Sequence, residues 1–98
     1  MTCKEAINKL DKNIYYCVYD VLDDLEIIKE VDLQDICKHR WEEYGTLIVQ
    51  LEDGYIGISG ITMMFNEVAD PADSNNPVTY CEYEISGYKP IFSPKETN

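Results

Sequence analysis

The side chains most able to do chemistry are carboxylates, which crowd between positions 20 and 35. Seven of these sixteen residues are acidic, and Lys29 is the only base among them. Paired carboxylates catalyse acid–base reactions only where their surroundings drive their pKa values apart. These carboxylates fall in segments that we expect to be turns and edges, with water available. The pattern therefore favours a charged surface over a catalytic dyad.

A strip of carboxylates on a rigid element would imitate the phosphates of a nucleic acid. Two residues of a β-strand span about 7 Å, close to the separation of successive phosphates in one strand. A protein with a nucleic-acid groove would be steered towards such a strip. We predict that the partner-binding residues are Asp20, Asp23, Asp24, Glu26 and Glu30, with Trp41 and Glu42 as the next candidates. The alternative, in which the strip with Asp32 and Asp35 is only a solvated surface, stays open.

The cysteines and the single histidine could supply metal ligands or a nucleophile. Cys37 and His39 stand two residues apart, whereas Cys3, Cys17 and Cys81 lie far from them in sequence. A zinc site takes three or four protein ligands, so we expect no metal and no cofactor. Nothing marks an oxyanion hole or a group that would orient the histidine for nucleophilic catalysis. We expect a surface histidine beside reduced, mostly buried cysteines.

Sequence signatures of common enzyme classes are absent. The chain has no P-loop, no dinucleotide-binding glycine motif, no nucleophile elbow and no EF-hand loop. We therefore predict that the protein is not an enzyme.

The composition is strongly acidic, with 19 Asp and Glu against 8 Lys and Arg and a formal net charge of −11. Such a charge opposes direct binding to nucleic acid or to an anionic membrane and favours a basic protein partner. No segment approaches the ~20 apolar residues of a membrane helix, and the first residues lack the apolar run of a secretory signal. We expect a protein that stays in the cytoplasm of the cell that makes it.

The first residues favour a helix over 2–11. Thr2 and Glu5 have the spacing of a capping box, in which each side chain accepts a hydrogen bond from the other residue's backbone N–H. Ala6 and Leu10 then follow at helical spacing.

The next segment has two interpretations. Residues 14–19 and 25–31 are rich in β-branched and aromatic residues and would form a hairpin around a turn at 22–24. The same apolar positions also fit one long helix over 14–30. Polar capping signals then indicate a short helix over 32–38.

The clearest element is a hairpin within residues 40–62. Asp53-Gly54 stands between two strand-like runs, which is the strongest short-range hairpin signal because glycine takes positive φ at no steric cost. Gly45 suggests a bulge in the first strand. Gly57 and Gly60 suggest that something packs closely against the second strand.

Residues 66–77 have the composition of a long loop, and residues 78–88 that of a last strand. We predict a single domain over 1–98, with a flexible tail from about residue 90. The fold class is α+β: an antiparallel sheet of four to five strands with one or two short helices on one face.

The stretches Lys38-His39-Arg40-Trp41 and Asp53-Gly54-Tyr55-Ile56-Gly57-Ile58-Ser59-Gly60 resemble small accessory proteins carried by phages and conjugative elements. No site residue carries over from that group. Mobile elements encode short acidic inhibitors of host defence, including anti-CRISPR proteins. The resemblance thus implies an inhibitor of a CRISPR effector or another defence nuclease. The alternative is a structural or regulatory module that forms a homodimer through apolar and tyrosine-rich surface.

Overall fold

The first helix begins at the expected capping box. In the computed structural model, which describes residues 1–65, 76–86 and 91–95, α1 spans Cys3–Leu10 and Thr2 is its N-cap. Thr2 Oγ1 accepts from the Glu5 backbone N–H at 3.2 Å, and the Glu5 carboxylate accepts from the Thr2 N–H at 3.1 Å. Ala6 and Leu10 are fully buried, so α1 is held by its apolar face as well as by its cap.

Neither interpretation of residues 14–31 is right as a whole, because only residues 29–31 form a strand, at the start of β1, Lys29–Lys38. Instead of a strand or a long helix, the chain forms α2, Val18–Val21, and a 3₁₀ turn, η1, Leu22–Asp24. Val18 and Val21 are fully buried, because a spacing of three places both on one side of a helical turn. At Leu25 the backbone becomes extended, which ends the helical stretch and leads the chain towards the sheet.

The helix expected over 32–38 is also wrong, because these residues belong to strand β1, Lys29–Lys38. Leu33 lies opposite Leu47 of the neighbouring strand, and this pairing outweighs the local capping signal. Asp32 caps no helix, but its Oδ1 accepts a hydrogen bond from the backbone N–H of Leu33 at 2.9 Å. Asp35 adopts a left-handed conformation with φ 56°, which Asp tolerates better than most residues.

The predicted hairpin is confirmed as β2, Glu42–Leu51, and β3, Gly54–Met64. Because Leu51 pairs with Gly54, the turn residues are Glu52 and Asp53, and Gly54 has no positive φ. The register shifts between Glu43 and Tyr44. The extra residue is thus in β3, at position 62, rather than at Gly45.

Close packing against the glycines of β3 is confirmed. A Cβ on Gly57 would lie 2.2 Å from Cε1 of Tyr83, and one on Gly60 would lie 2.9 Å from Cγ2 of Val78. Both neighbours come from the last part of the chain, so the glycines let that part approach the middle of the sheet.

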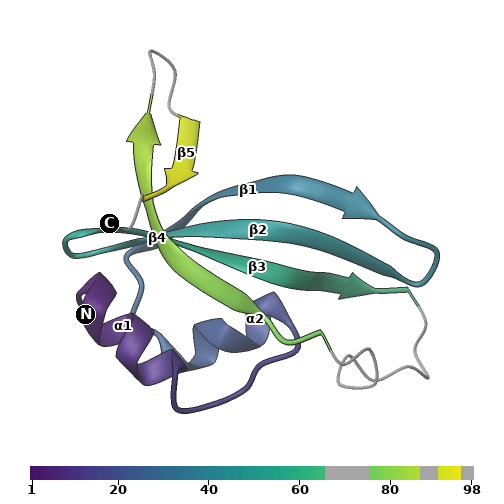
Figure 1. Ribbon diagram of the computed structural model, residues 1–98, viewed down its shortest axis with the longest axis horizontal. Coiled ribbons are helices and arrows are strands. Elements are labelled where there is room, and N and C mark those ends of the chain that lie inside the picture. The colour runs from purple at the N-terminus through teal and green to yellow at the C-terminus, as the bar shows by residue number, and fades with distance from the viewer. Residues whose placement is uncertain (66–75, 87–90, 96–98) are drawn as a thin grey trace.

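Two further strands complete the sheet, whose order is β1-β2-β3-β4-β5 with every pair antiparallel. β4 spans Thr79–Ser86 and β5 spans Ile91–Pro94, where we had expected the tail to begin. β4 pairs with β3 through its first half and with β5 through its second half, so the β4–β5 pair projects from the sheet (Figure 1). Most of the expected 66–77 loop lies outside the described residues.

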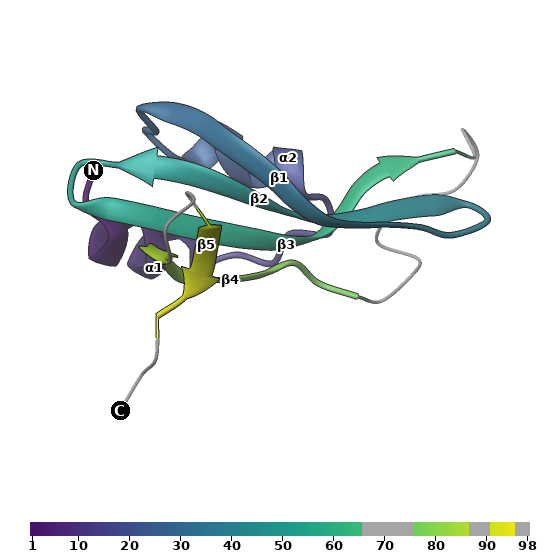
Figure 2. The ribbon, with the colours of Figure 1, turned by 90° about the horizontal axis from the view of Figure 1, so that it is seen from above.

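The helices cover one face of the sheet (Figures 1 and 2). Leu47, Val49, Ile56 and Ile58 pack there against residues of α1 and α2. On the other face Ile48 is buried beneath Tyr83, and Val31 and Tyr55 pack against these two residues. The predicted α+β class, an antiparallel sheet with short helices on one face, is confirmed.

Candidate interaction surface

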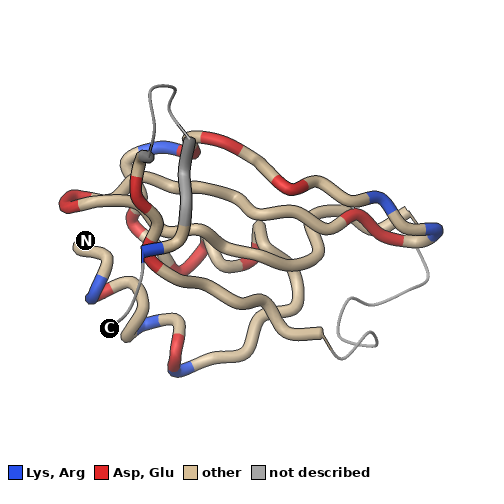
Figure 3. Tube along the Cα trace, turned by 45° about the horizontal axis from the view of Figure 1, so that its top comes forward, with Lys and Arg blue, Asp and Glu red and all other residues tan. Residues whose placement is uncertain are grey.

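The carboxylates between positions 20 and 35 line one side of the molecule, which we call the acidic edge. They follow the chain through α2, η1 and the connection to β1, and then along β1, the outermost strand. Figure 3 shows the acidic segments along β1, and Figure 2 shows β1 and α2 towards the same side. Six of the seven are solvent-exposed: Asp20, Asp23, Glu26, Glu30, Asp32 and Asp35. The expected hairpin is absent, but its carboxylates still gather on one side.

Asp24 differs from the rest of the acidic edge because it is half-buried and serves the fold. The Tyr15 hydroxyl donates a hydrogen bond to Asp24 Oδ2, and this bond raises the pKa of Tyr15. Asp24 therefore holds the loop before α2 and is less available to a partner than its neighbours.

The α2 and β1 parts of the acidic edge lie within electrostatic reach of each other. Burial raises the pKa of Tyr19 on α2, and the charges of Glu30 and Glu43 raise it further. Glu30 comes from β1 and Glu43 from β2. The helix, the edge strand β1 and its neighbour β2 therefore contribute to one negative field.

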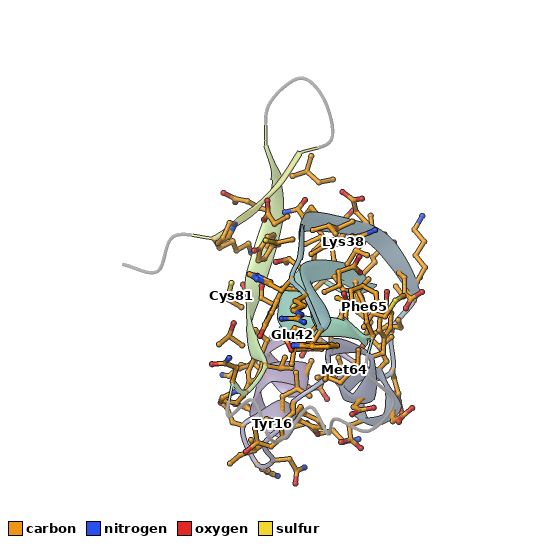
Figure 4. The ribbon with its side chains drawn as sticks, turned by 90° about the vertical axis from the view of Figure 1, so that its right-hand side faces the viewer. Tyr16, Lys38, Glu42, Met64, Phe65 and Cys81 are labelled. Atoms are coloured by element: carbon orange, nitrogen blue, oxygen red, sulfur yellow. The ribbon has the colours of Figure 1, made fainter. Side chains whose placement is uncertain are left out.

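A second surface lies at the end of the sheet where β1 turns into β2, and we call it the sheet tip. Four large apolar side chains are exposed there: Ile36 at 52%, Trp41 at 49%, Met63 at 52% and Phe65 at 46%. The Phe65 N–H donates to the Trp41 carbonyl at 2.7 Å, which joins the end of β3 to the β1–β2 turn. Figure 4 faces this end of the molecule. Four exposed apolar side chains at one end of the sheet make this end a candidate interaction site.

Of the two further candidates, Trp41 is exposed at the sheet tip, whereas the other apolar residues of the tip were not among the predicted binding residues. The Arg40 guanidinium carbon lies 4.7 Å from the centre of the Trp41 ring, a cation–π contact. Glu42 is half-buried and accepts a hydrogen bond from the Tyr44 hydroxyl at 3.1 Å. The apolar run that ends at Phe65 could have revealed these residues from the sequence. Its last residues, 63–65, extend beyond the hairpin that was predicted to end at residue 62.

A shallow depression of about 320 Å³ lies on the sheet face away from the helices, where Asp35, Tyr44, Thr46, Ser59 and Thr79 contribute to its lining. Thr46 Oγ1 and Ser59 Oγ are 2.7 Å apart. The lining thus combines hydroxyl groups with one carboxylate, which suits hydrogen bonding to a small polar group.

The cysteines differ from the expectation. Cys3 is buried and Cys17 is half-buried, but Cys37 and Cys81 are exposed, and all four are free thiols. Cys37 Sγ is 3.5 Å from His39 Nε2, and the His39 ring stands edge-on to Tyr44 at 5.1 Å. Within the part of the chain that the structure describes, no three metal-binding side chains come together.

Comparison with known proteins identifies no relative: no family model, no curated protein and no solved structure matches the chain. Among the described residues, no helix has both the length and the apolar character to cross a membrane.

Proposed function

We propose that the protein is a non-enzymatic inhibitor that binds, through its acidic edge, a basic nucleic-acid-binding surface of a partner protein. The partner class that we propose is a bacterial defence nuclease of the CRISPR type. The protein would act by steric and electrostatic competition with the nucleic acid.

The observation that carries this proposal is the exposure of six carboxylates along α2, η1 and β1. The ion pairs found among the described residues, Met1–Glu52 and Glu82–Lys95, lie elsewhere. The carboxylates of the acidic edge thus keep their charge available for a partner. A field of one sign attracts the opposite charge over a distance and speeds association.

A phage plating assay tests the proposal. The protein is expressed in bacterial strains that each carry one defined CRISPR system, and plating of a targeted phage is counted with and without it. We expect restored plating in at least one strain, and inhibition of DNA binding by the purified effector of that system. If plating stays blocked in every strain, the assignment to this partner class is wrong.

A matched pair of variants links the inhibition to the acidic edge. The variant Asp23→Asn/Glu30→Gln removes two exposed charges from the edge, and Glu52→Gln/Glu84→Gln removes two from the β2–β3 turn and β4. We expect the first to weaken effector binding and the second to retain it. Binding should also weaken between about 0.1 M and 1 M salt, where the screening length falls from about 10 to 3 Å.

The alternative is a structural or regulatory homodimer. The exposed apolar side chains of the sheet tip favour it, because a second copy would bury them. Its test is the oligomeric state of the purified protein. A Trp41→Ala variant that converts a dimer into a monomer at all salt concentrations would support it, because apolar contacts are not screened by ions.

A further inference from the structure

Cys37 and His39 have the spacing of two ligands on one tetrahedral metal ion. Cys37 Sγ and His39 Nε2 are 3.5 Å apart. Bonds of about 2.3 Å from zinc to sulfur and about 2.0–2.1 Å from zinc to nitrogen, at a tetrahedral angle, separate the two ligand atoms by about 3.6 Å. The distance between the two atoms thus matches that between two ligands of one ion.

The pair is also held in place by its surroundings. Cys37 lies opposite Tyr44 in the β1–β2 ladder. The backbone N–H of His39 donates to the backbone carbonyl of Glu42 at 2.8 Å. The Tyr44 ring meets the His39 ring edge-on, with an angle of 87° between the planes. Ligands fixed by packing and hydrogen bonds lose less freedom when the metal binds.

Two ligands leave a tetrahedral site half complete. Structural zinc takes four protein ligands, and the described part of the chain brings no third metal-binding side chain to this pair. A two-fold axis through the ion would add the same cysteine and histidine from a second copy. The resulting set of two thiolates and two imidazoles is a common structural zinc site.

The sheet tip favours a second copy as the source of the missing ligands. Ile36 and Trp41 flank the pair in sequence and are half-exposed apolar side chains, which a second tip would bury. Lys38 and Arg40 offset Glu42 and Glu43 there, and Asp35 leaves a charge of −1 over residues 35–43 in a chain of net charge −11. A contact at this end brings less like charge together than a contact along the acidic edge.

We propose that Cys37 and His39 form half of a zinc site, which a second copy of the chain completes to give a Cys₂His₂-bridged dimer at the sheet tip. Each Cys37 thiol releases its proton to solvent when it binds as a thiolate. This inference goes beyond the proposed function, because its residues are separate from the acidic edge.

Zinc titration of the purified chain, with a phosphine reductant present, tests the proposal. Calorimetry should give one Zn²⁺ per two chains, and light scattering should show the molar mass doubling with Zn²⁺ and returning to its original value with a chelator. Co²⁺ should give the intense visible absorption of tetrahedral coordination and a sulfur-to-cobalt band. Cys37→Ser and His39→Asn should each abolish the doubling, whereas Cys81→Ser, which changes the other exposed thiol, should not.

Three outcomes would overturn the proposal. They are a molar mass that does not respond to Zn²⁺, one metal per chain without dimerisation, and a dimer that survives the chelator and the Cys37→Ser variant. The Asp23→Asn/Glu30→Gln variant should dimerise with Zn²⁺ like the wild type. A failure of the inhibitor proposal therefore leaves the zinc result unaffected, and the reverse also holds.

Discussion

The contact between Tyr83 and Gly57 predicts the effect of a single methyl group. A Cβ at position 57 would lie 2.2 Å from the Tyr83 ring, and Tyr83 is itself buried on the open face. The ring would have to move and uncover Ile48. We expect Gly57→Ala to lower the free energy of unfolding by about 1–3 kcal/mol, as overpacking does, measured by urea denaturation.

Gly54→Ala is the matched control for this prediction. A Cβ there meets only Cys3 Sγ, at 3.5 Å, and Gly54 has no positive φ. The unfolded chain loses freedom when alanine replaces glycine, which stabilises the folded state by about 0.4–1 kcal/mol. Equal effects of the two substitutions would contradict the packing that we describe.

The cysteines should react with an alkylating agent at very different rates. Burial, followed by the hydrogen bond to Asp53, raises the pKa of Cys3 to about 12, whereas Cys37 is exposed at the sheet tip. Because the thiolate is the nucleophile, Cys37 should be labelled first and Cys3 only when the chain unfolds. Peptide mass spectrometry of a time course at about pH 8 measures this order, and a Cys3 as fast as Cys37 would refute it.

The thiols also show where residue-level inference from sequence fails. Cysteine is usually buried, so the sequence favoured buried thiols throughout. Cys37 is exposed because it lies on an edge strand, near the end of the β1–β2 ladder. Burial of a residue on a strand depends on the position of that strand in the sheet, which the local sequence does not specify.

At the level of elements, the cap of α1 predicts sensitivity to acid. Hydrogen bonds from Thr2 lower the pKa of Glu5, and the hydrogen bond from the Cys3 N–H lowers the pKa of Asp53. A carboxyl group with a lower pKa in the folded state stabilises the fold fully above its unfolded pKa. That contribution is lost as the pH falls through the folded-state value. We therefore expect the urea midpoint to fall below about pH 4, near the usual pKa of these groups.

Two variants separate the cap from general acid effects. Thr2→Ala should lower the free energy of unfolding by about 1 kcal/mol at neutral pH, and Thr2→Ser should retain the cap. Glu5→Gln should reduce the loss of stability between neutral and acidic pH. An acid response that is the same with Gln as with Glu would show that the cap does not contribute to it.

The elements predicted correctly are those specified by local chemistry. The capping box marks the start of α1, and Asp53-Gly54 marks the β2–β3 hairpin, because both signals depend on a few adjacent residues. Residues 14–28 and 32–38 were predicted wrongly because their apolar pattern fits a strand as well as a helix. The buried contacts of Val18 and Val21 and the pairing of Leu33 with Leu47 select among them, and these contacts join residues distant in sequence.

For the whole molecule, the net charge of −11 predicts that salt stabilises the fold. Repulsion among the carboxylates of the acidic edge is stronger in the compact state than in the unfolded chain. Raising the salt from about 0.01 M to 1 M shortens the screening length from about 30 to 3 Å. We expect the thermal midpoint to rise, measured by circular dichroism, and to rise less in the Asp23→Asn/Glu30→Gln variant. A midpoint that falls with salt would contradict self-repulsion.

The candidate surfaces were predictable to different extents. The acidic edge was visible in sequence because seven carboxylates lie close together along the chain, whatever secondary structure they adopt. The sheet tip was not, since Ile36, Trp41 and Phe65 come from separate segments that only the β1–β2–β3 register brings to one end. The alignment of Cys37 Sγ with His39 Nε2 likewise required the strand geometry.

The irregular shape of β1 has a consequence for how this protein can change over time. Register shifts near Val31 and Asp35, with the left-handed backbone of Asp35, break the flat run of backbone groups that another strand would need for pairing. A partner that binds along this side, as we propose, would therefore contact side chains rather than the main chain. Because most of these carboxylates are exposed and do not pack in the core, they can be replaced one at a time without altering the fold. Such a surface can follow a changing target while the scaffold beneath it stays the same.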